Sequence, residues 1–453
     1  MRSLLHAVFV LSTVLACTDF VAAALNTHYQ WRFIDYQWES YGQKYLANKT
    51  GLYVPKKIIP YDVQRLSDGR VLVTTPRYFN NPASLSVISQ VYGSNGPLLA
   101  PYPNWRWHDA KDCSGITSVN RIRVDECDRL WIVDSGKIGN ERICPAKILQ
   151  FDTKNDRLVQ QIEIPKELSR NPDDKTKGRL ELQTVETAGE SCAETWVYVS
   201  DLEGYGLIIW DGEDIWRLND NVFKPDPNQT TFSVGGENFT LSLGPSGFLI
   251  GPEGYLKDRY AFFKPLSANK GYAVSTADLH NSKLGGDVIY YITEYTAPSQ
   301  ELGRDFSKLG GFLIAGFTTE TLVACWNIQY PLEDRYIGFL EQNATTLQYI
   351  NSIKITLDRS RRTETVDVLT NRLQKFVRGT MNFNEINFRI LSSDVRSLIN
   401  GTICAPRGNQ SVEKFVEAKG FRFFDITQHS PIGSNSWWNR WTKKVGNWFS
   451  KSS

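Results

Sequence analysis

The chain has 453 residues, of which 41% are hydrophobic and 22% charged, a composition typical of a globular protein and unlike that of a disordered chain. Its 51 basic and 49 acidic residues give a formal net charge of +2, which argues against a dedicated nucleic-acid-binding protein. Its sequence contains no internal run of about 20 apolar residues, which excludes a polytopic membrane protein. The 12% aromatic content, 33 glycines and 19 prolines indicate a β-rich, turn-rich fold.

The first 24 residues predict a secretory signal peptide. Arg2 supplies a positive start, residues 4–17 are mostly apolar, and residues 22–24 are the small residues that a signal peptidase needs. A retained signal anchor is the alternative, but its apolar core is short for a bilayer span. We therefore expect cleavage after Ala24 and a secreted, extracellular protein.

Six cysteines remain after the signal peptide, which predicts three disulfides and no leftover thiol in an oxidising compartment. No CxxC pair occurs, so we expect no metal site and no other cofactor. Six N-x-S/T sequons predict a glycoprotein. These sequons begin at Asn48, Asn228, Asn238, Asn343, Asn400 and Asn409.

A short β-favouring hydrophobic run recurs six times, at a spacing of roughly 50–65 residues. Two adjacent strands cannot close a core alone, whereas six units around an axis protect their sheet edges. The pattern predicts an all-β, six-bladed β-propeller over residues 25–410, with a β-sandwich of two domains as the alternative. The runs span residues 70–75, 129–135, 195–201, 259–263, 311–316 and 365–370.

Several longer motifs give the chain a specific resemblance. From about Trp31 to Cys404 it resembles the insect yellow/major royal jelly protein family, which implies a secreted, glycosylated six-bladed propeller with the same six cysteines. The tail beyond Pro406 departs from the family. The motifs that carry the resemblance are residues 96–103, 112–119, 125–136, 324–327 and 382–390.

Six cysteines allow fifteen connectivities. Four of them cluster in two neighbouring units, and the other two stand apart in the last units of the chain. We predict the pairs Cys113–Cys144, Cys127–Cys192 and Cys325–Cys404.

A propeller places ligand sites at a mouth of its central channel, where we expect the inner strands to end in small polar residues. Their alternative role is turn formation, and the recurrence of Asp134 and Asp201 at equivalent points favours a role in the fold. These predicted strand ends are Thr74/Thr75, Asp134/Ser135, Ser200/Asp201 and Thr370/Asn371.

The resemblance also implies two ligand chemistries. Some family members bind biogenic amines in the channel, which makes Thr370, Asn371, Asn387 and Phe388 the candidate ligand-binding residues; alternatively, residues 387–389 pack the closing strand. An ammonium needs polar acceptors, and an aromatic ring needs apolar walls.

Other family members convert dopachrome in melanin synthesis, an isomerisation that needs a base poised near neutral pH. His108 is the candidate catalytic residue, because Asp109 could orient its ring and Arg106 could meet a carboxylate. The alternative is a surface loop whose tryptophans pack under a blade. Gly-rich phosphate loops, HExxH and GxSxG motifs are missing from the sequence, so nucleotide, zincin and α/β-hydrolase chemistry has no support.

Residues 434–450 of the tail predict an amphipathic helix with an aromatic face and a basic face. Such a helix could bind a membrane surface, a partner protein or the propeller itself, and a disordered terminus is the alternative.

Three functions remain open at this stage. The first is binding of a small aromatic amine or catechol, linked to pigmentation or to cuticle or eggshell. The second is dopachrome isomerisation, and the third is a structural or nutritional role without a ligand.

Overall fold

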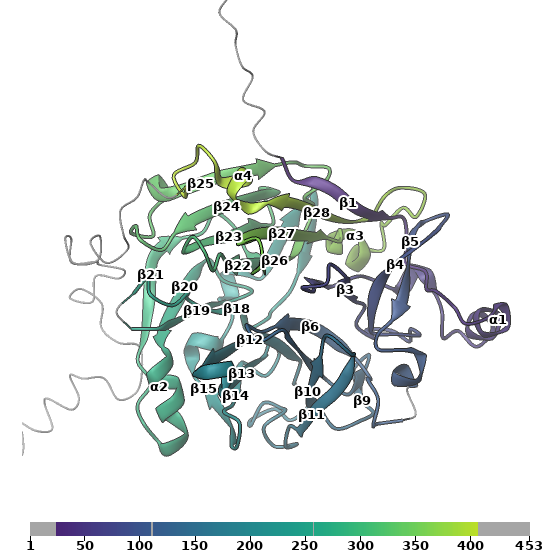
Figure 1. Cartoon of the computed structure of the whole chain (residues 1–453), viewed down its shortest axis with the longest axis horizontal. Helices are drawn as coiled ribbons and strands as arrows, with labels where there is room; N and C mark the ends of the chain where they lie inside the picture. Colours follow the sequence, from purple (N-terminus) through teal and green to yellow (C-terminus); the bar gives the residue numbers. More distant parts are fainter. Residues whose placement is uncertain (1–23, 110–111, 257, 406–453) are drawn as a thin grey trace, which may run out of the picture.

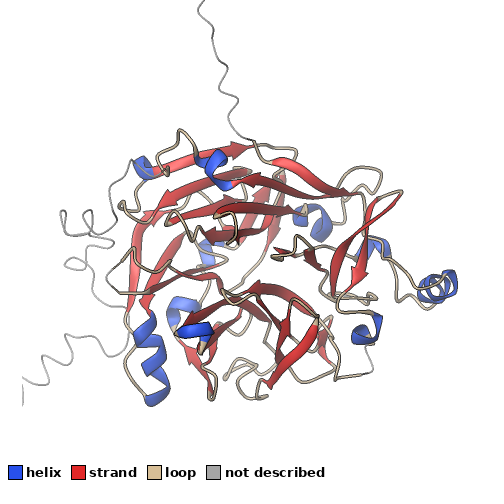
Figure 2. Ribbon diagram, viewed as in Figure 1, coloured by secondary structure: helices blue, strands red, loops and turns tan. Residues whose placement is uncertain are grey.

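The computed structural model describes residues 24–109, 112–256 and 258–405. Six four-stranded antiparallel sheets surround a central axis (Figure 1). Strands dominate, and the few helices lie in the connections between them (Figure 2). The structure therefore confirms a six-bladed β-propeller. Residues 1–23 of the predicted signal peptide and the predicted helix 434–450 lie outside the described residues.

Each of the first five blades is a four-stranded antiparallel meander, counted here from the axis outward, and in blade 2 a short hairpin, residues 137–142, is inserted between the second and third strands. Blade 1 contains β2 (Asp62–Arg65), β3 (Val71–Thr74), β4 (Leu85–Gly93) and β5 (Gly96–Pro101). Blade 2 contains β6 (Val119–Val124), β7 (Arg129–Asp134), β10 (Lys147–Asp152) and β11 (Arg157–Glu163). Blade 3 contains β12 (Leu180–Ala188), β13 (Glu194–Asp201), β14 (Gly206–Trp210) and β15 (Ile215–Asn219).

Blade 4 contains β18 (Pro245–Ile250), β19 (Tyr260–Pro265), β20 (Lys270–Ser275) and β21 (Tyr290–Thr296). Blade 5 contains β22 (Glu301–Phe306), β23 (Phe312–Phe317), β24 (Leu322–Asn327) and β25 (Ile337–Gln342). Blade 6 contains β26 (Ile350–Asp358), β27 (Thr363–Thr370), β28 (Phe388–Asp394) and the N-terminal strand β1 (Asn26–Trp31). The connections carry the hairpins β8 (Lys137–Ile138)–β9 (Glu141–Arg142) and β16 (Thr231–Val234)–β17 (Glu237–Thr240), and helices α1 (Tyr41–Lys49), α2 (Thr276–Asn281) and α3 (Leu373–Arg378), whereas α4 (Val395–Ile399) follows β28.

The hydrophobic runs that we expected to form the inner strands form the second strand of each blade instead. The six strands are β3, β7, β13, β19, β23 and β27. A second strand is covered on both faces by the neighbouring blades, so almost all of its residues are buried and apolar, as in β3 and β7. The number of blades was predicted correctly, but the strands that face the axis were not.

The N-terminal strand β1 closes the ring by pairing antiparallel with β28 as the outermost strand of blade 6. Trp31 at its end is 1% exposed and donates from Nε1 to the carbonyl of Pro97 in blade 1, at 2.7 Å. Gly96 has a φ of +134°, and a Cβ there would lie 2.6 Å from Cδ1 of Trp31. The first strand of the propeller thus joins its last blade to its first.

Three disulfides brace the ring, and they are the three pairs predicted from the sequence. Cys113–Cys144 lies within the blade 2 segment, and Cys127–Cys192 joins blade 2 to blade 3. Cys325–Cys404 fastens the segment after α4 to β24 of blade 5.

Five of the six predicted glycosylation sites lie among the described residues. Asn48, Asn228, Asn238 and Asn400 are exposed, and Asn343 is partly exposed, whereas Asn409 lies outside the described residues. Among the described helices, none has the length and apolar character required to cross a membrane.

Candidate functional site in the central channel

The inner strands place a ring of charged side chains around the axis. Asp62 of β2, Arg121 of β6 and Glu181 of β12 are all buried, as is Lys354 of β26. Successive residues of a strand point to opposite faces, so these residues alternate with apolar ones such as Val63. Polar contacts therefore join the inner strands of different blades.

Asp62 is the centre of the first group of contacts. Its Oδ2 accepts the backbone N–H of Ile122 at 3.0 Å and lies 3.3 Å from Nζ of Lys354. Its Oδ1 accepts from the hydroxyl of Ser352 and lies 3.5 Å from Nη1 of Arg121. Desolvation by burial lowers the pKa of Lys354 to about 8, although Asp62 opposes that shift.

Glu181 is the centre of the second group. It accepts from Nε of Arg121 at 3.1 Å and from the Tyr61 hydroxyl at 2.7 Å, and Nη2 of Arg179 lies 3.4 Å away. The guanidinium groups of Arg121 and Arg179 lie 5.1 and 5.7 Å from the centre of the Tyr61 ring. Burial and the Glu181 carboxylate raise the pKa of Tyr61 to about 12, so its hydroxyl remains a donor at neutral pH.

Two asparagines of blade 6 leave unpaired oxygens beside this group. Nδ2 of Asn351 donates to the carbonyl of Tyr61, and Nδ2 of Asn371 donates to the preceding carbonyl, that of Pro60, at 2.9 Å. Both side chains are fully buried, and neither Oδ1 has a hydrogen-bond partner. Oε1 of the buried Gln374, at the start of α3, is also unpaired. Because buried acceptors are rarely left unpaired, these oxygens mark a place for a donor group.

The other three candidate ligand-binding residues have structural partners. Thr370 donates its hydroxyl to the carbonyl of Thr346 at 2.8 Å. Asn387 donates to three backbone carbonyls, and its Oδ1 accepts from Arg372 at 3.4 Å. Phe388 is fully buried in the core between blades 6 and 1. Asn387 and Phe388 lie at the start of β28, the third strand of blade 6, away from the axis. Their geometry therefore corresponds to the alternative in which residues 387–389 pack the closing strand.

His108 has a structural environment as well. It ends a 3-10 turn (Trp105–His108), is 4% exposed, and its Nε2 lies 2.9 Å from the carbonyl of Tyr102. Its Nδ1 accepts the backbone N–H of Ser84 at 3.3 Å. Burial, with help from Arg77, lowers its pKa to about 3. A ring with both nitrogens bonded to backbone and so low a basicity is unsuited to serve as a base near neutral pH.

Asp134 and Asp201 take the role in the fold that their recurrence indicated. Asp134 accepts the N–H groups of Thr117 and Ser118, both at 2.8 Å, just before the inner strand of blade 2. Asp201 accepts the N–H of Arg179 at 2.7 Å just before the inner strand of blade 3. Each carboxylate thus fixes the start of the inner strand of its own blade.

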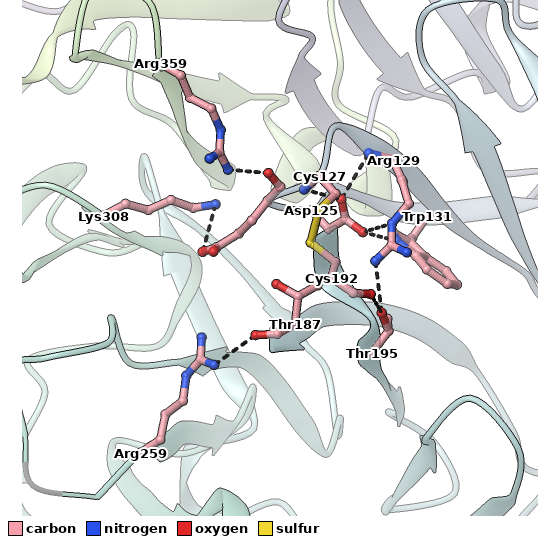
Figure 3. Close-up of a disulfide and its surroundings, with 11 residues drawn as sticks. Asp125, Cys127, Arg129, Trp131, Thr187, Cys192, Thr195, Arg259, Lys308 and Arg359 are labelled. Carbon is pink, nitrogen blue, oxygen red and sulfur yellow. Dashed lines mark hydrogen bonds and ion pairs between the residues drawn. A yellow bond between two sulfur atoms is a disulfide. The ribbon is translucent and has the colours of Figure 1, made fainter. Parts of the chain in front are cut away.

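At the opposite ends of the inner strands, basic side chains of three blades gather near the Cys127–Cys192 disulfide (Figure 3). Figure 3 shows Arg259, Lys308 and Arg359, from blades 4, 5 and 6, around the loop that carries the Cys127–Cys192 disulfide. Arg359 donates to the carbonyl of Glu126, and Nζ of Lys308 lies 3.4 Å from the carboxylate of that residue. No group of three or more potential metal ligands occurs among the described residues.

Sequence reasoning missed Asp62, Arg121, Glu181 and Asn351. A signal was present, because short segments just before the hydrophobic runs alternate polar and apolar residues. The segment 119–124, Val-Asn-Arg-Ile-Arg-Val, is an example.

The comparisons with protein families and with curated proteins agree. The family described as major royal jelly protein matches residues 117–404. Major royal jelly protein 9 of Apis mellifera is 36% identical over 395 residues, which cover 85% of this chain and 91% of that protein. Major royal jelly protein 1 of the same organism is 34% identical over 391 residues, covering 83% and 88%. Among solved structures, virginiamycin B lyase from Staphylococcus aureus aligns with a TM-score of 0.36 and 12% identity, covering 75% of this chain and 95% of the lyase.

Proposed function

Because this chain belongs to the major royal jelly protein family, we propose that it is a secreted binding protein for a small aromatic amine or catechol. Three disulfides support an extracellular location, since such bonds persist in oxidising compartments. In this proposal, the ligand site is the channel mouth where blades 6 and 1 meet.

The pair of unpaired oxygens on Asn351 and Asn371 carries the proposal. Both need a donor, and the ammonium of an amine or the hydroxyls of a catechol are donors. The carboxylates of Asp62 and Glu181 are contacted by the cations of Arg121, Arg179 and Lys354, so both carboxylates are already paired and the two amide oxygens are the acceptors offered to a ligand. Planar guanidinium groups over Tyr61 form a surface on which an aromatic ring stacks.

A titration of the full chain with dopamine and serotonin tests this function. Replacing Asn371 by Ala removes one acceptor for a charged donor, which should weaken binding by about 1.5–3 kcal/mol. Asn387→Ala is the matched control, because Asn387 is an equally buried amide of the same blade whose oxygen is already paired. We expect that control to lower thermal stability and to leave amine affinity unchanged.

Two results would contradict the proposal. One is the absence of binding of either amine to the native protein at millimolar concentration. The other is equal affinity of the Asn371→Ala and Asn387→Ala variants, which would exclude the channel mouth as the site.

Dopachrome isomerisation is the weaker candidate. His28 lies in β1, His280 in α2 and His108 in the 3-10 turn at Trp105–His108, so no histidine of the described residues belongs to an inner strand. Lys354 is the basic group of the channel whose pKa, lowered to about 8, lies closest to neutral pH. Its Nζ, however, donates to the carbonyl of Ile122 at 2.9 Å. A dopachrome-decay assay distinguishes this activity from simple binding, and failure of both assays would favour a structural or nutritional role.

A further inference from the structure

A second candidate site lies between blades 4 and 5, away from the axis. A partly open, mostly apolar cavity of about 70 Å³ lies between β19, β20 and β21 on one side and β22, β23 and β24 on the other. Its wall includes members of two separate hydrophobic clusters. The aromatic lining consists of Phe262, Phe263, Tyr272, Tyr295, Phe306, Phe317 and Trp326.

One charged side chain in this wall lacks a hydrogen bond. Lys264 of β19 is 3% exposed, and its Nζ has no hydrogen-bond partner among the described residues. The nearest carboxylate oxygen, Oε1 of Glu301, is 3.6 Å away and also accepts from Nη1 of Arg304 at 2.9 Å. Desolvation lowers the pKa of Lys264 to about 8, so the ammonium form still predominates at neutral pH. Lys264 and Arg304 therefore share the Glu301 carboxylate, and the Lys264 ammonium retains N–H groups without an acceptor.

This arrangement has an energetic consequence. A buried ammonium needs acceptors to replace the water that it has lost, and the shared carboxylate supplies only part of that replacement. The surrounding aromatic and aliphatic side chains supply none. An anionic oxygen entering the cavity would restore the missing contacts of Lys264.

We propose that the cavity between blades 4 and 5 binds a small apolar carboxylate, with its carboxylate against Lys264 and its hydrocarbon part against the aromatic wall. The buried Oδ1 of Asn269, also unpaired and in the same wall, could accept from a ligand hydroxyl.

Size and charge restrict the ligand. The cavity exceeds the space that one water molecule needs, and it is about half the volume of an engineered cavity that accepts benzene. A single-ring or six-carbon acid therefore fits only with its carboxylate end inside and part of its ring or chain outside the cavity, and a larger lipid does not fit. The unpaired ammonium of Lys264 repels an amine, whereas the channel mouth offers the unpaired amide oxygens of Asn351 and Asn371, so the two sites favour ligands of opposite charge.

Calorimetric titration of the full chain with benzoate and hexanoate tests the proposal, with benzylamine as a cation of matched shape. We expect both acids to bind and benzylamine to show no binding to this site. Lys264→Met removes the ammonium and retains the length of the side chain, so it should weaken benzoate binding at least tenfold. Lys270→Met is the matched control, because Lys270 is an exposed lysine of the adjacent strand β20.

A second variant keeps the test decisive if Lys264→Met does not fold. Ala324 is 2% exposed and lines the cavity, so Ala324→Leu fills the space and should abolish benzoate binding. Neither variant should change the affinity for dopamine at the channel mouth. Failure of the proposed acid site can therefore be distinguished from failure of the proposed amine site. The proposal is overturned if neither acid binds, if benzylamine competes with benzoate, or if benzoate affinity survives in either cavity variant that folds.

Discussion

At the scale of single residues, buried polar side chains in this propeller mostly hold backbone in place. Asp134 and Asp201 each fix the start of an inner strand, and His108 joins two backbone groups of blade 1. Sequence reasoning predicted the role of the two aspartates because they recur in register. It could not rank Asn371 above Asn387, because both are amides in the same part of the chain and only the fold shows which oxygen is unpaired.

The environment of His108 predicts a pH-dependent contribution to stability. In the folded protein its pKa is lowered from 6.5 to about 3, mainly by burial. Between pH 6.5 and about pH 3, the ring therefore binds a proton in the unfolded chain and not in the folded protein. Stability must therefore fall as the pH falls below 6.5, and the loss between about pH 7 and pH 5 should be about 2 kcal/mol. Urea unfolding at both pH values should show this loss in the native chain and not in His108→Gln. An equal pH dependence in the two proteins would contradict it.

At the scale of strands, the hydrophobic pattern predicted the second strand of each blade but not the first. A second strand such as β7 is buried on both faces between blades and reads as a continuous apolar run. An inner strand such as β6 places polar side chains against the inner strands of other blades, so Asn120, Arg121 and Arg123 interrupt its apolar residues. Six repeats were therefore countable from the sequence, whereas the inner strands left only a short alternation of polar and apolar residues, which in β6 a bulge interrupts.

The closing strand β1 should contribute strongly to stability through one residue. Trp31 is 1% exposed, contacts the core between blades 6 and 1 and donates to the carbonyl of Pro97. Trp31→Ala leaves a large cavity and should cost about 3–5 kcal/mol of unfolding free energy. Gln30→Ala, at an exposed position of the same strand, should change stability by less than about 0.5 kcal/mol. Chemical unfolding followed by tryptophan-independent circular dichroism measures both, and a comparable cost for the two variants would rule out this role for β1.

At the scale of the whole molecule, two devices hold blade 6 in the ring. The strand β1 joins it to blade 1 at its outer edge, and Cys325–Cys404 fastens the chain after it to blade 5. The two devices belong to different hydrophobic clusters, with Trp31 in one and both cysteines in the other. They also act differently, because the tryptophan packs in the folded state, whereas the disulfide mainly restricts the unfolded chain.

This separation predicts additive effects. The bond between Cys325 and Cys404 spans 79 residues, so replacing both cysteines by Ala should cost about 4 kcal/mol in the chain-entropy account. Combining that change with Trp31→Ala should give the sum of the two losses to within about 0.5 kcal/mol, since sites that share no neighbours rarely couple. A double-mutant cycle of unfolding free energies measures the coupling. A coupling of more than about 1 kcal/mol would instead mean that blade 6 detaches from the ring as a unit, so that either device alone can hold it.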